Sequence, residues 1–234
     1  MVEDCAMESQ NDALRADVTS VFVVDDDAGV LRGLGRLLKC EGYEVKQFST
    51  PDAFLQDHDP SEPGCAIIDL SLPRQDGLTL LRRLNDGRSD RQVIILTGHS
   101  SITSCVEAMQ AGAIDYLVKP VEKRALLRAV ECAIARDRTL RDARVYKEAI
   151  SARLESLTPR EREVLEHVIA GRLNKQIAAD LGTVEKTIKV HRARMLMKMG
   201  VRSVAALVHL TDSIGLEPRA QPRCRIQVGG APRS

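Results

Sequence analysis

Residues 21–30 read VFVVDDDAGV, four apolar residues followed directly by three carboxylates. Three of the four apolar residues are β-branched valines, which predicts a short strand buried on both faces of a sheet. The adjacent acids Asp25, Asp26 and Asp27 repel one another at the end of that strand, which raises their pKa values unless a cation lies beside them. The stretch therefore predicts a buried strand whose end holds a cation.

The same alternation of apolar runs and helical patterns continues through the first half of the chain. Strands are predicted over residues 21–24, 43–47, 65–68, 92–96 and 116–118. Amphipathic patterns with leucines on one face lie between them, as expected for helices. Five such units predict an α/β domain with a doubly wound, five-stranded parallel sheet of the flavodoxin-like class. In such sheets, ligands bind beyond the carboxyl ends of the strands.

Polar side chains also follow the later strands of this predicted sheet. Asp69 ends the third strand, Thr97 ends the fourth, and Lys119 follows the fifth. Parallel strands place their carboxyl ends along one edge, so these side chains are expected to converge with those of Asp25 and Asp26. An acidic turn after one strand is commonly structural, but polar residues at four strand ends favour a site.

Hard cations take oxygen ligands, and Mg²⁺ typically uses one or two carboxylates and keeps several waters. The predicted cation is therefore Mg²⁺, held by Asp26 and Asp69 directly and by Asp25 through water. A carboxylate so placed can act as a nucleophile toward a phosphoryl group and form an acyl phosphate. Lys119 would offset charge on the transferring oxygens, and Thr97 would donate a hydrogen bond to one of them.

The motifs VVDDD, IIDLSLPRQDGLTLL, VIILTGH and AMQAGAIDYLVKP together resemble the receiver domain of two-component response regulators over residues 19–138. The resemblance implies that Asp69 accepts a phosphoryl group from a sensor histidine kinase. The other implied roles are metal binding for Asp25, Asp26 and the backbone carbonyl of Ser71, and switching or phosphate contact for Thr97, Tyr116 and Lys119.

The connection and the two ends of the chain differ in composition from the predicted domain. Residues 1–18 form a polar, acidic leader, and residues 217–234 form a basic tail rich in Pro and Gly that is expected to be disordered. Residues 121–158 contain neither Gly nor Pro, so the last helix is expected to continue into a helical linker at 139–152. A break near residues 137–141, where charges crowd, is an equal alternative.

A second, all-α domain of four helices is predicted over residues 153–216. Thr158 suits the N-cap of its first helix, Pro159 the first helical position, and Glu161 completes a capping box. The later helix boundaries are expected at Gly171, which ends that helix, Asn174, which caps the next, and Gly182, which precedes a third.

The sequence from Leu157 to Ser203 resembles the LuxR-type helix-turn-helix, and together with the receiver it resembles the FixJ/NarL subclass of regulators. The resemblance implies that the third helix of this domain enters the major groove of double-stranded DNA. Leu173 stands where the family usually has Ser or Thr, and the order Thr183–Val184 reverses the usual one. Because Val is a poor N-cap, the start of the third helix is left open.

Periodicity gives an independent view of that third helix. At 100° per residue the stripe expected to face the core is Val184, Ile188, Met195 and Met199, with His191 at its edge, and the opposite stripe is Lys186, Val190, Ala193 and Met197. A basic helix face is also typical of a merely solvated surface, but small apolar residues between cations suit base edges and thymine methyls better. The predicted DNA-binding residues are Lys175, Lys186, Thr187, Lys189, Val190, Ala193 and Arg194, of which Lys175, Lys189 and Arg194 should meet phosphates.

Charge and cysteine usage fit a two-part protein. The chain has 234 residues and a net charge of +1, but residues 20–138 carry −3 and residues 151–216 carry +4. This asymmetry favours a metal or phosphate site in front and nucleic acid behind. The six cysteines form no C-x-x-C pair, which indicates reduced, mostly buried residues of a cytoplasmic protein. No apolar run approaches the ~20 residues of a membrane span, so no membrane partner is expected.

These observations predict a phosphorylation-dependent, DNA-binding transcriptional regulator and not an enzyme. Its apolar helix over residues 100–111 suggests a homodimer on phosphorylation, and RNA polymerase is a further candidate partner. The alternative from another class is a Mg²⁺-dependent aspartyl-phosphate phosphatase of the haloacid-dehalogenase kind, which needs a second acid two residues after its nucleophile, where this chain has Ser71. A DNA-binding protein with a relict receiver is a third reading, which the intact acids, Thr97 and Lys119 argue against.

Overall fold

The computed structural model describes residues 19–73, 75–86, 90–99 and 101–216. The chain divides into two compact units, Met1–Asp142 and Ala143–Ser234. The acidic leader and the basic tail predicted from the sequence lie outside the described residues.

The first unit is built on a five-stranded sheet in the order β2-β1-β3-β4-β5, with all neighbouring strands parallel. The strands are β1 (Ser20–Val24), β2 (Glu44–Phe48), β3 (Gly64–Asp69), β4 (Gln92–Thr97) and β5 (Asp115–Val118). The predicted doubly wound fold is confirmed, and each strand ends within one residue of its predicted bounds. Every residue of β1, β3 and β4 is buried, as the continuous apolar runs indicated.

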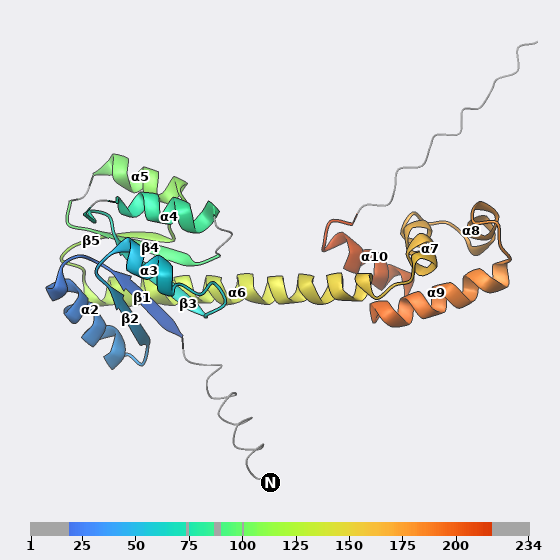
Figure 1. Cartoon of the computed structure of the whole chain (residues 1–234), viewed down its shortest axis with the longest axis horizontal. Helices are drawn as coiled ribbons and strands as arrows, with labels where there is room; N and C mark the ends of the chain where they lie inside the picture. The colour runs from blue at the N-terminus through green and yellow to red at the C-terminus, as the bar shows by residue number, and fades with distance from the viewer. Residues whose placement is uncertain (1–18, 74, 87–89, 100, 217–234) are drawn as a thin grey trace, which may run out of the picture. The chain divides into compact units, whose positions relative to one another are not determined.

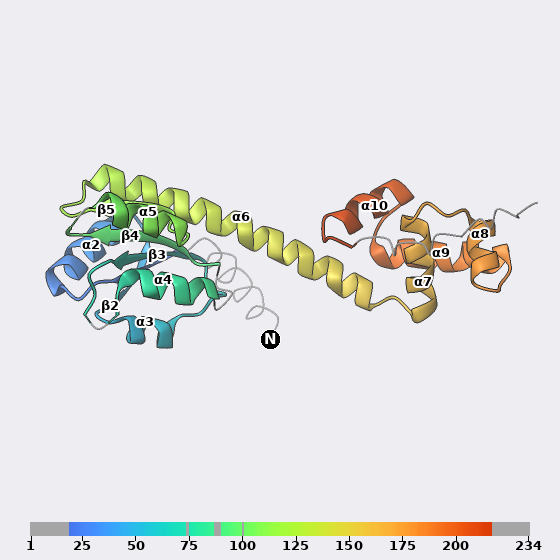
Figure 2. The ribbon, with the colours of Figure 1, turned by 90° about the horizontal axis from the view of Figure 1, so that it is seen from above.

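Helices cover both faces of this sheet (Figure 1). They are α2 (Ala28–Cys40), α3 (Pro51–Asp57), α4 (Gly77–Asp86), α5 (Ile102–Gln110) and α6 (Lys123–Glu155). Because side chains alternate along a strand, Phe22 of β1 packs in the cluster with α3, α4 and α5, whereas Val21 and Val23 pack in the cluster with α2 and α6. Figure 2 shows α3 and α4 on one side of the sheet and α6 on the other.

Side chains that precede the helices satisfy their first backbone N–H groups. The carboxylate of Asp27 accepts from Gly29 N at 2.6 Å and from Val30 N, at the start of α2. These two hydrogen bonds hold the pKa of the Asp27 carboxyl below its usual value. Thr50 and Ser101 cap α3 and α5 in the same way. The third acid of the opening stretch therefore forms an N-cap.

Helix α6 is a single helix of 33 residues, so the alternative of a break near residues 137–141 is not observed. Its early turns place Leu126, Ala129 and Val130 in the core of the first unit. Its late turns place Ile150 in the core of the second unit. None of the helices in the described part of the chain is long and apolar enough to cross a membrane.

The second unit adds four helices around its own core. They are α7 (Pro159–Ile169), α8 (Asn174–Asp180), α9 (Glu185–Met199) and α10 (Val204–Asp212). The predicted capping box is present, with Thr158 N donating to Glu161 Oε2 at 2.9 Å and Glu161 N donating to Thr158 Oγ1 at 3.3 Å. The buried carboxylate of Glu161 also pairs with Lys198 of α9 at 2.7 Å, which ties α7 to α9.

Three details of the sequence interpretation are wrong. Asn174 is the first residue of α8 and its N-cap is Leu173, whose side chain forms no cap hydrogen bond. Val184 does not face the core: it is the N-cap of α9 and is 65% exposed. The cysteines are not mostly buried, because among those described Cys65 is buried, Cys105 is half-buried, and Cys40 and Cys132 are exposed. All four are free thiols, as expected.

Candidate functional site

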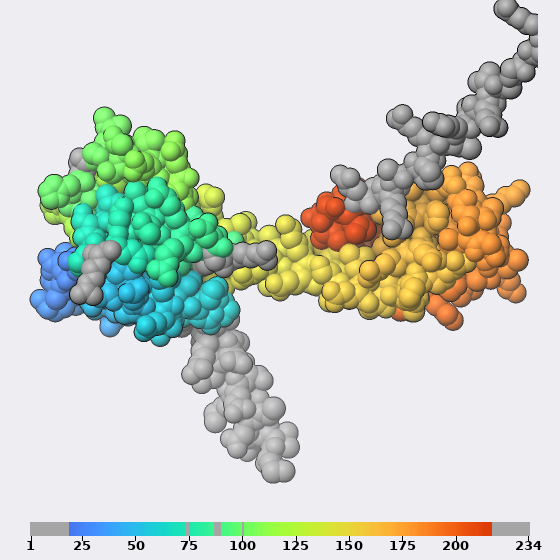
Figure 3. Space-filling model, turned by 45° about the horizontal axis from the view of Figure 1, so that its top comes forward, coloured from blue at the N-terminus to red at the C-terminus, as the bar shows by residue number. Residues whose placement is uncertain are grey.

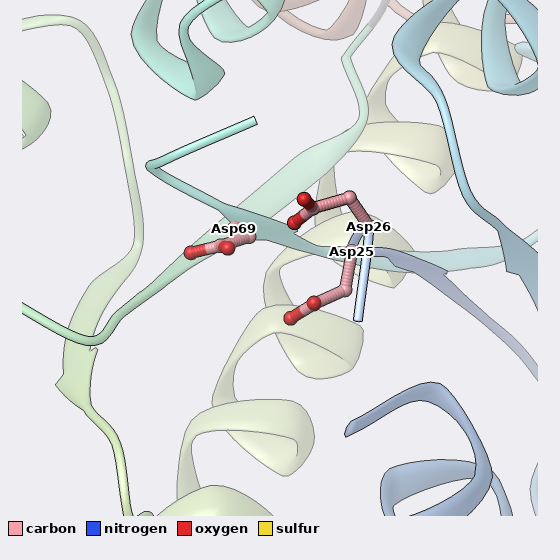
Figure 4. Close-up of side chains that lie close together, drawn as sticks. All are labelled: Asp25, Asp26 and Asp69. Carbon is pink, nitrogen blue, oxygen red and sulfur yellow. The ribbon is translucent and has the colours of Figure 1, made fainter. Parts of the chain in front are cut away.

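Three carboxylates gather at the carboxyl edge of the sheet. Asp25 and Asp26 follow β1, Asp69 ends the neighbouring strand β3, and one oxygen of each lies within 4.8 Å of the others (Figure 4). Asp25 is 1% exposed and Asp69 is 6% exposed, whereas Asp26 is exposed. Two of the three acids are thus buried, and a buried charge needs a partner of opposite charge.

The ammonium group of Lys119 lies between the two buried acids. Its Nζ is 2.6 Å from Asp25 Oδ2 and 3.2 Å from Asp69 Oδ2. Burial raises the pKa of Asp25, and the hydrogen bond from Lys119 offsets this only in part. Burial alone would lower the pKa of Lys119, but its hydrogen bonds to Asp25 and Asp69 and their charges outweigh it and raise the pKa. One cation therefore faces a larger negative charge.

Asp69 also has an oxygen that is left over from this pairing. Its Oδ1 is buried and has no hydrogen-bond partner among the described residues. A buried, unpaired carboxylate oxygen is costly, and here it stands beside two further acids. Three carboxylates with one ammonium form the oxygen-rich donor set that a hard divalent cation prefers. The residues present therefore fit Mg²⁺.

Gly77 is a residue of this site that the sequence analysis missed. A Cβ built on Gly77 would lie 2.3 Å from the backbone oxygen of Asp69, so a larger residue cannot approach the strand end so closely. The signal in the sequence was the turn-forming Asp76–Gly77 pair before α4. Ser71 lies two residues after Asp69 and is exposed. The role of its backbone carbonyl as a metal ligand stays a prediction.

Among the described residues, neither the hydroxyl of Thr97 nor that of Tyr116 forms a recorded hydrogen bond with the three carboxylates. Thr97 Oγ1 donates to the carbonyl oxygen of His99 at 3.0 Å and accepts from His99 N at 3.2 Å. The hydroxyl of Tyr116 is buried and has no hydrogen-bond partner among the described residues. Both groups lie on strands β4 and β5, which pair side by side. The Tyr116 hydroxyl can gain a hydrogen-bond partner if it moves, whereas Thr97 would have to give up its hydrogen bond to the carbonyl oxygen of His99.

In the second unit, α9 presents a mixed basic and apolar face. Ile188, Met195 and Met199 are buried, as predicted. The residues of the predicted contact face that are exposed are Lys186, Lys189, Val190, Ala193, Arg194 and Met197, with Thr187 half-buried and Lys175 exposed on α8. His191 is half-buried, as expected for the edge of the core. Lys189 Nζ lies 3.2 Å from Glu185 Oε1, a pairing between exposed groups that costs little to break.

A further polar contact joins α9 to α8 and was not foreseen. Arg192 Nη1 donates to the side-chain oxygen of Asn174 at 2.8 Å. Arg160 Nη2 donates to the carbonyl of Leu181 at 2.7 Å, which ties α7 to the residue that follows α8. The first contact joins α9 to α8, the second joins α7 to the end of α8, and neither uses the exposed face of α9.

Comparison with known proteins identifies both units. Residues 21–131 match the response regulator receiver domain, and residues 155–211 match the bacterial regulatory proteins of the luxR family. The chain is a two-component response regulator. It is of the FixJ/NarL type, a receiver followed by a LuxR-type DNA-binding domain.

Several relatives of this response regulator match most of its length. Nodulation protein W of Bradyrhizobium diazoefficiens is 39% identical over 199 residues, covering 84% of this chain and 86% of the relative. The transcriptional regulatory protein FixJ of the same species is 37% identical, covering 84% and 96%. Among solved structures, that of the response regulator StyR matches with a TM-score of 0.77 and 40% identity over 83% of this chain and 98% of that one.

Family membership settles the broad function. The response regulator is a phosphorylation-dependent regulator of transcription with a DNA-binding output domain. The alternative of an aspartyl-phosphate phosphatase is not favoured, because the luxR-family domain has no place in it.

Proposed function

We propose that Asp69 of this response regulator accepts a phosphoryl group from a sensor histidine kinase in the cytoplasm. The observation that carries the proposal is the buried, unpaired oxygen of Asp69 beside Asp25, Asp26 and Lys119. A carboxylate oxygen of Asp69 attacks phosphorus, the bond from phosphorus to the donor's leaving group breaks, and an acyl phosphate remains on Asp69. The protein acts as a regulator and not as an enzyme.

In this proposal Asp26, Asp69 and the backbone carbonyl of Ser71 would hold Mg²⁺, and Asp25 would act through water. The ion supplies positive charge that offsets the charge of the phosphoryl oxygens. The ammonium of Lys119, already 3.2 Å from Asp69, supplies a second positive charge from the protein itself. Burial of Asp25 and Asp69 would strengthen both effects, because charges interact more strongly away from bulk water.

The same proposal assigns the switch to Thr97 and Tyr116. A phosphoryl group on Asp69 adds strong acceptor oxygens, which compete with the carbonyl of His99 for the hydroxyl of Thr97. Movement of Thr97 leaves space beside β5, into which Tyr116 turns. Because the Tyr116 hydroxyl lacks a hydrogen-bond partner among the described residues, its movement breaks no recorded hydrogen bond.

We assign the homodimer contact to an apolar face of α5 and β5, composed of Ile102, Val106, Met109 and Val118. Ile102 is 86% exposed, and the other three are also exposed. Figure 3 shows α5, in green, at the surface of the first unit beside α4. Large apolar side chains grouped on a surface are typical of an interaction site. A two-fold dimer brings two DNA-binding domains to a two-fold DNA site.

For the output we propose that α9 enters the major groove of double-stranded DNA. Lys186, Val190 and Ala193 then face bases, while Lys175, Lys189 and Arg194 face phosphates and Thr187 lies beside them. The working domains are residues 19–138 and 153–216, joined by the helical linker 139–152. RNA polymerase is the further partner proposed for the DNA-bound dimer.

Treatment with acetyl phosphate and Mg²⁺ is expected to raise the affinity of the whole protein for its DNA by about tenfold or more, since typical allosteric couplings span 5- to 150-fold. Fluorescence anisotropy of labelled duplex measures the affinity, and light scattering should show the molecular mass doubling. The control replaces Ile102 with Ser, which should lower the dimer fraction and leave labelling of the protein unchanged. A rise in affinity by a protein that stays monomeric would favour release of a masked domain over dimerisation.

Two substitutions on α9 should separate phosphate contact from base contact. Lys189→Gln is expected to weaken binding to all sequences alike and to lower the salt slope by about one. Val190→Ala should instead change the sequence preference, because it removes an apolar contact with bases. Selection from a random duplex pool measures the preference, and Lys147→Gln, an exposed lysine of α6, is the matched control. An unchanged selected site in Val190→Ala would mean that α9 is oriented differently.

A further inference from the structure

Arg141 attaches helix α6 to the loop that leads into the amino end of the central strand β3. The guanidinium donates to three successive backbone carbonyls, with Nη1 bonded to Ser61 at 2.5 Å and Nη2 bonded to Pro60 at 3.1 Å and Glu62 at 2.5 Å. Its Nε donates to Asp137 Oδ2 at 2.7 Å, one helical turn earlier. A planar fork of five donors suits such a set of fixed acceptors, which a lysine cannot match. Arg141 therefore joins α6 to the loop between α3 and β3.

Asp137 forms the second half of this attachment. It is 3% exposed, and its Oδ2 accepts from the backbone N–H of Gly64, the first residue of β3, at 3.0 Å. The charge of this buried carboxylate is balanced by the ion pair with Arg141. A buried ion pair of this kind fixes the positions of its two side chains, because removing one partner leaves the other charge buried and uncompensated. We call Asp137 and Arg141 together the latch.

A second arginine contacts the same loop. Arg91 is buried, and its Nη2 donates to the carbonyl of Asp59 at 2.8 Å. Its guanidinium lies 4.5 Å from the centre of the Phe22 ring, a cation–π contact. Burial lowers the pKa of Arg91, and the nearby charge of Asp137 offsets this in part. The carbonyl groups of residues 59–62 thus all accept hydrogen bonds from Arg91 or Arg141, which restricts movement of the loop that the latch contacts.

Strand β3 connects the latch to the candidate phosphorylation site. Gly64 begins the strand and Asp69 ends it, five residue steps away, which is roughly 16 Å at about 3.3 Å per residue. The strand is buried throughout and pairs on both sides. The same rigid element therefore touches the phosphoryl-accepting carboxylate at one end and α6 at the other.

Beyond the latch, α6 continues through a run of largely exposed turns. From Asp142 to Ala149 the side chains are exposed, apart from the half-buried Arg144. An exposed helical segment of this length has little stability of its own in water. Its helical state therefore depends on the contacts that hold α6 at each end, and the latch is the contact on the receiver side.

We propose that the latch fixes the point at which α6 leaves the receiver and transmits the response from Asp69 to the DNA-binding domain. The transmission rests on the proposed function, whereas the attachment of α6 does not. The receiver then has two states, one in which the latch holds α6 firmly and one in which it holds α6 less firmly. Phosphorylation changes the free-energy difference between these two states.

Three variants of the whole protein test the latch. Arg141→Met removes the donors and keeps most of the side-chain volume, and Asp137→Asn keeps the shape and removes the charge. Arg138→Met is the matched control, since Arg138 is an exposed arginine on the same helix. The first measurement is amide hydrogen exchange of residues 58–64 and 138–146. Both latch variants should exchange about tenfold faster there than the wild type, as expected for local opening, whereas Arg138→Met should not.

The second measurement is the gain in DNA affinity on treatment with acetyl phosphate and Mg²⁺. Arg141→Met should still incorporate phosphate on Asp69 but lose most of the gain, while Arg138→Met should keep it. Unchanged exchange in both latch variants would overturn the attachment of α6, and a full gain in DNA affinity in Arg141→Met would overturn the transmission. A wild-type protein that labels on Asp69 and shows no gain would instead overturn the proposed regulation and the transmission with it, and exchange would still decide the attachment.

Discussion

Replacing Asp69 with Asn is expected to abolish incorporation of acid-labile phosphate from acetyl phosphate in the presence of Mg²⁺. The amide introduced by this substitution cannot act as the nucleophile, and the change also removes a negative charge from the donor set of Asp25 and Asp26. Asp69 combines a buried oxygen that lacks a hydrogen-bond partner among the described residues with a second oxygen 3.2 Å from Lys119 Nζ, which makes it the expected nucleophile. Labelling with ³²P-acetyl phosphate, followed by acid and base treatment of the product, measures the effect.

The control for this experiment is Asp76→Asn. Asp76 is an exposed acid in the same loop, and its carboxylate accepts a hydrogen bond from Leu78 N at the start of α4. Asn retains that acceptor, so Asp76→Asn should label at the wild-type level. Labelling that survives in Asp69→Asn would show that another group is the nucleophile and would remove the basis of the proposed function.

Replacing Gly64 with Ala is expected to lower the free energy of unfolding of the receiver by more than about 4 kcal/mol, the range reserved for severe local conflicts. Gly64 has φ +142°, a conformation that L-residues rarely adopt. Its Cβ would lie 1.9 Å from the carbonyl oxygen of Ser20 in the adjacent strand, which is backbone and cannot move aside. Denaturant unfolding followed by circular dichroism measures the loss.

Gly33→Ala is the matched control, because the substitution is identical and the environment is opposite. Gly33 lies within helix α2, and a Cβ there would meet no atom within 4 Å. Replacing Gly with Ala inside a helix should raise the free energy of unfolding by about 0.5–1 kcal/mol. A loss of less than about 1 kcal/mol in Gly64→Ala would mean that β3 begins with a different backbone geometry.

The parts of the fold that the sequence predicted well are those in which one physical rule dominates. Strands β1, β3 and β4 are buried on both faces, so a continuous apolar run marks each one and the acids or hydroxyl that follow mark its end. The capping box at Thr158 depends on residues three positions apart, and a local pattern of that kind is visible without a structure.

Other features depend on packing that no local pattern records. The helical periodicity of α9 was extended to Val184, but that residue precedes the helix and has extended backbone geometry, so the 100° step does not apply to it. The charges at Asp137 and Arg141 suggested a break in α6 as an alternative. Their partners, however, lie 73 to 81 residues away, in the loop before β3 and at its first residue. The same charges therefore hold the helix in place.

Because Asp27 forms an N-cap, its position should vary more freely among related regulators than the positions of the two acids before it. A cap needs only a short side chain with an acceptor oxygen, which Asn, Ser and Thr also provide. Asp25 is buried against Lys119, and Asp26 belongs to the carboxylate cluster, so the proposed metal site needs a negative charge at both positions. Drift in sequence should therefore accumulate at position 27 and be excluded from positions 25 and 26, although the three residues look alike in the chain.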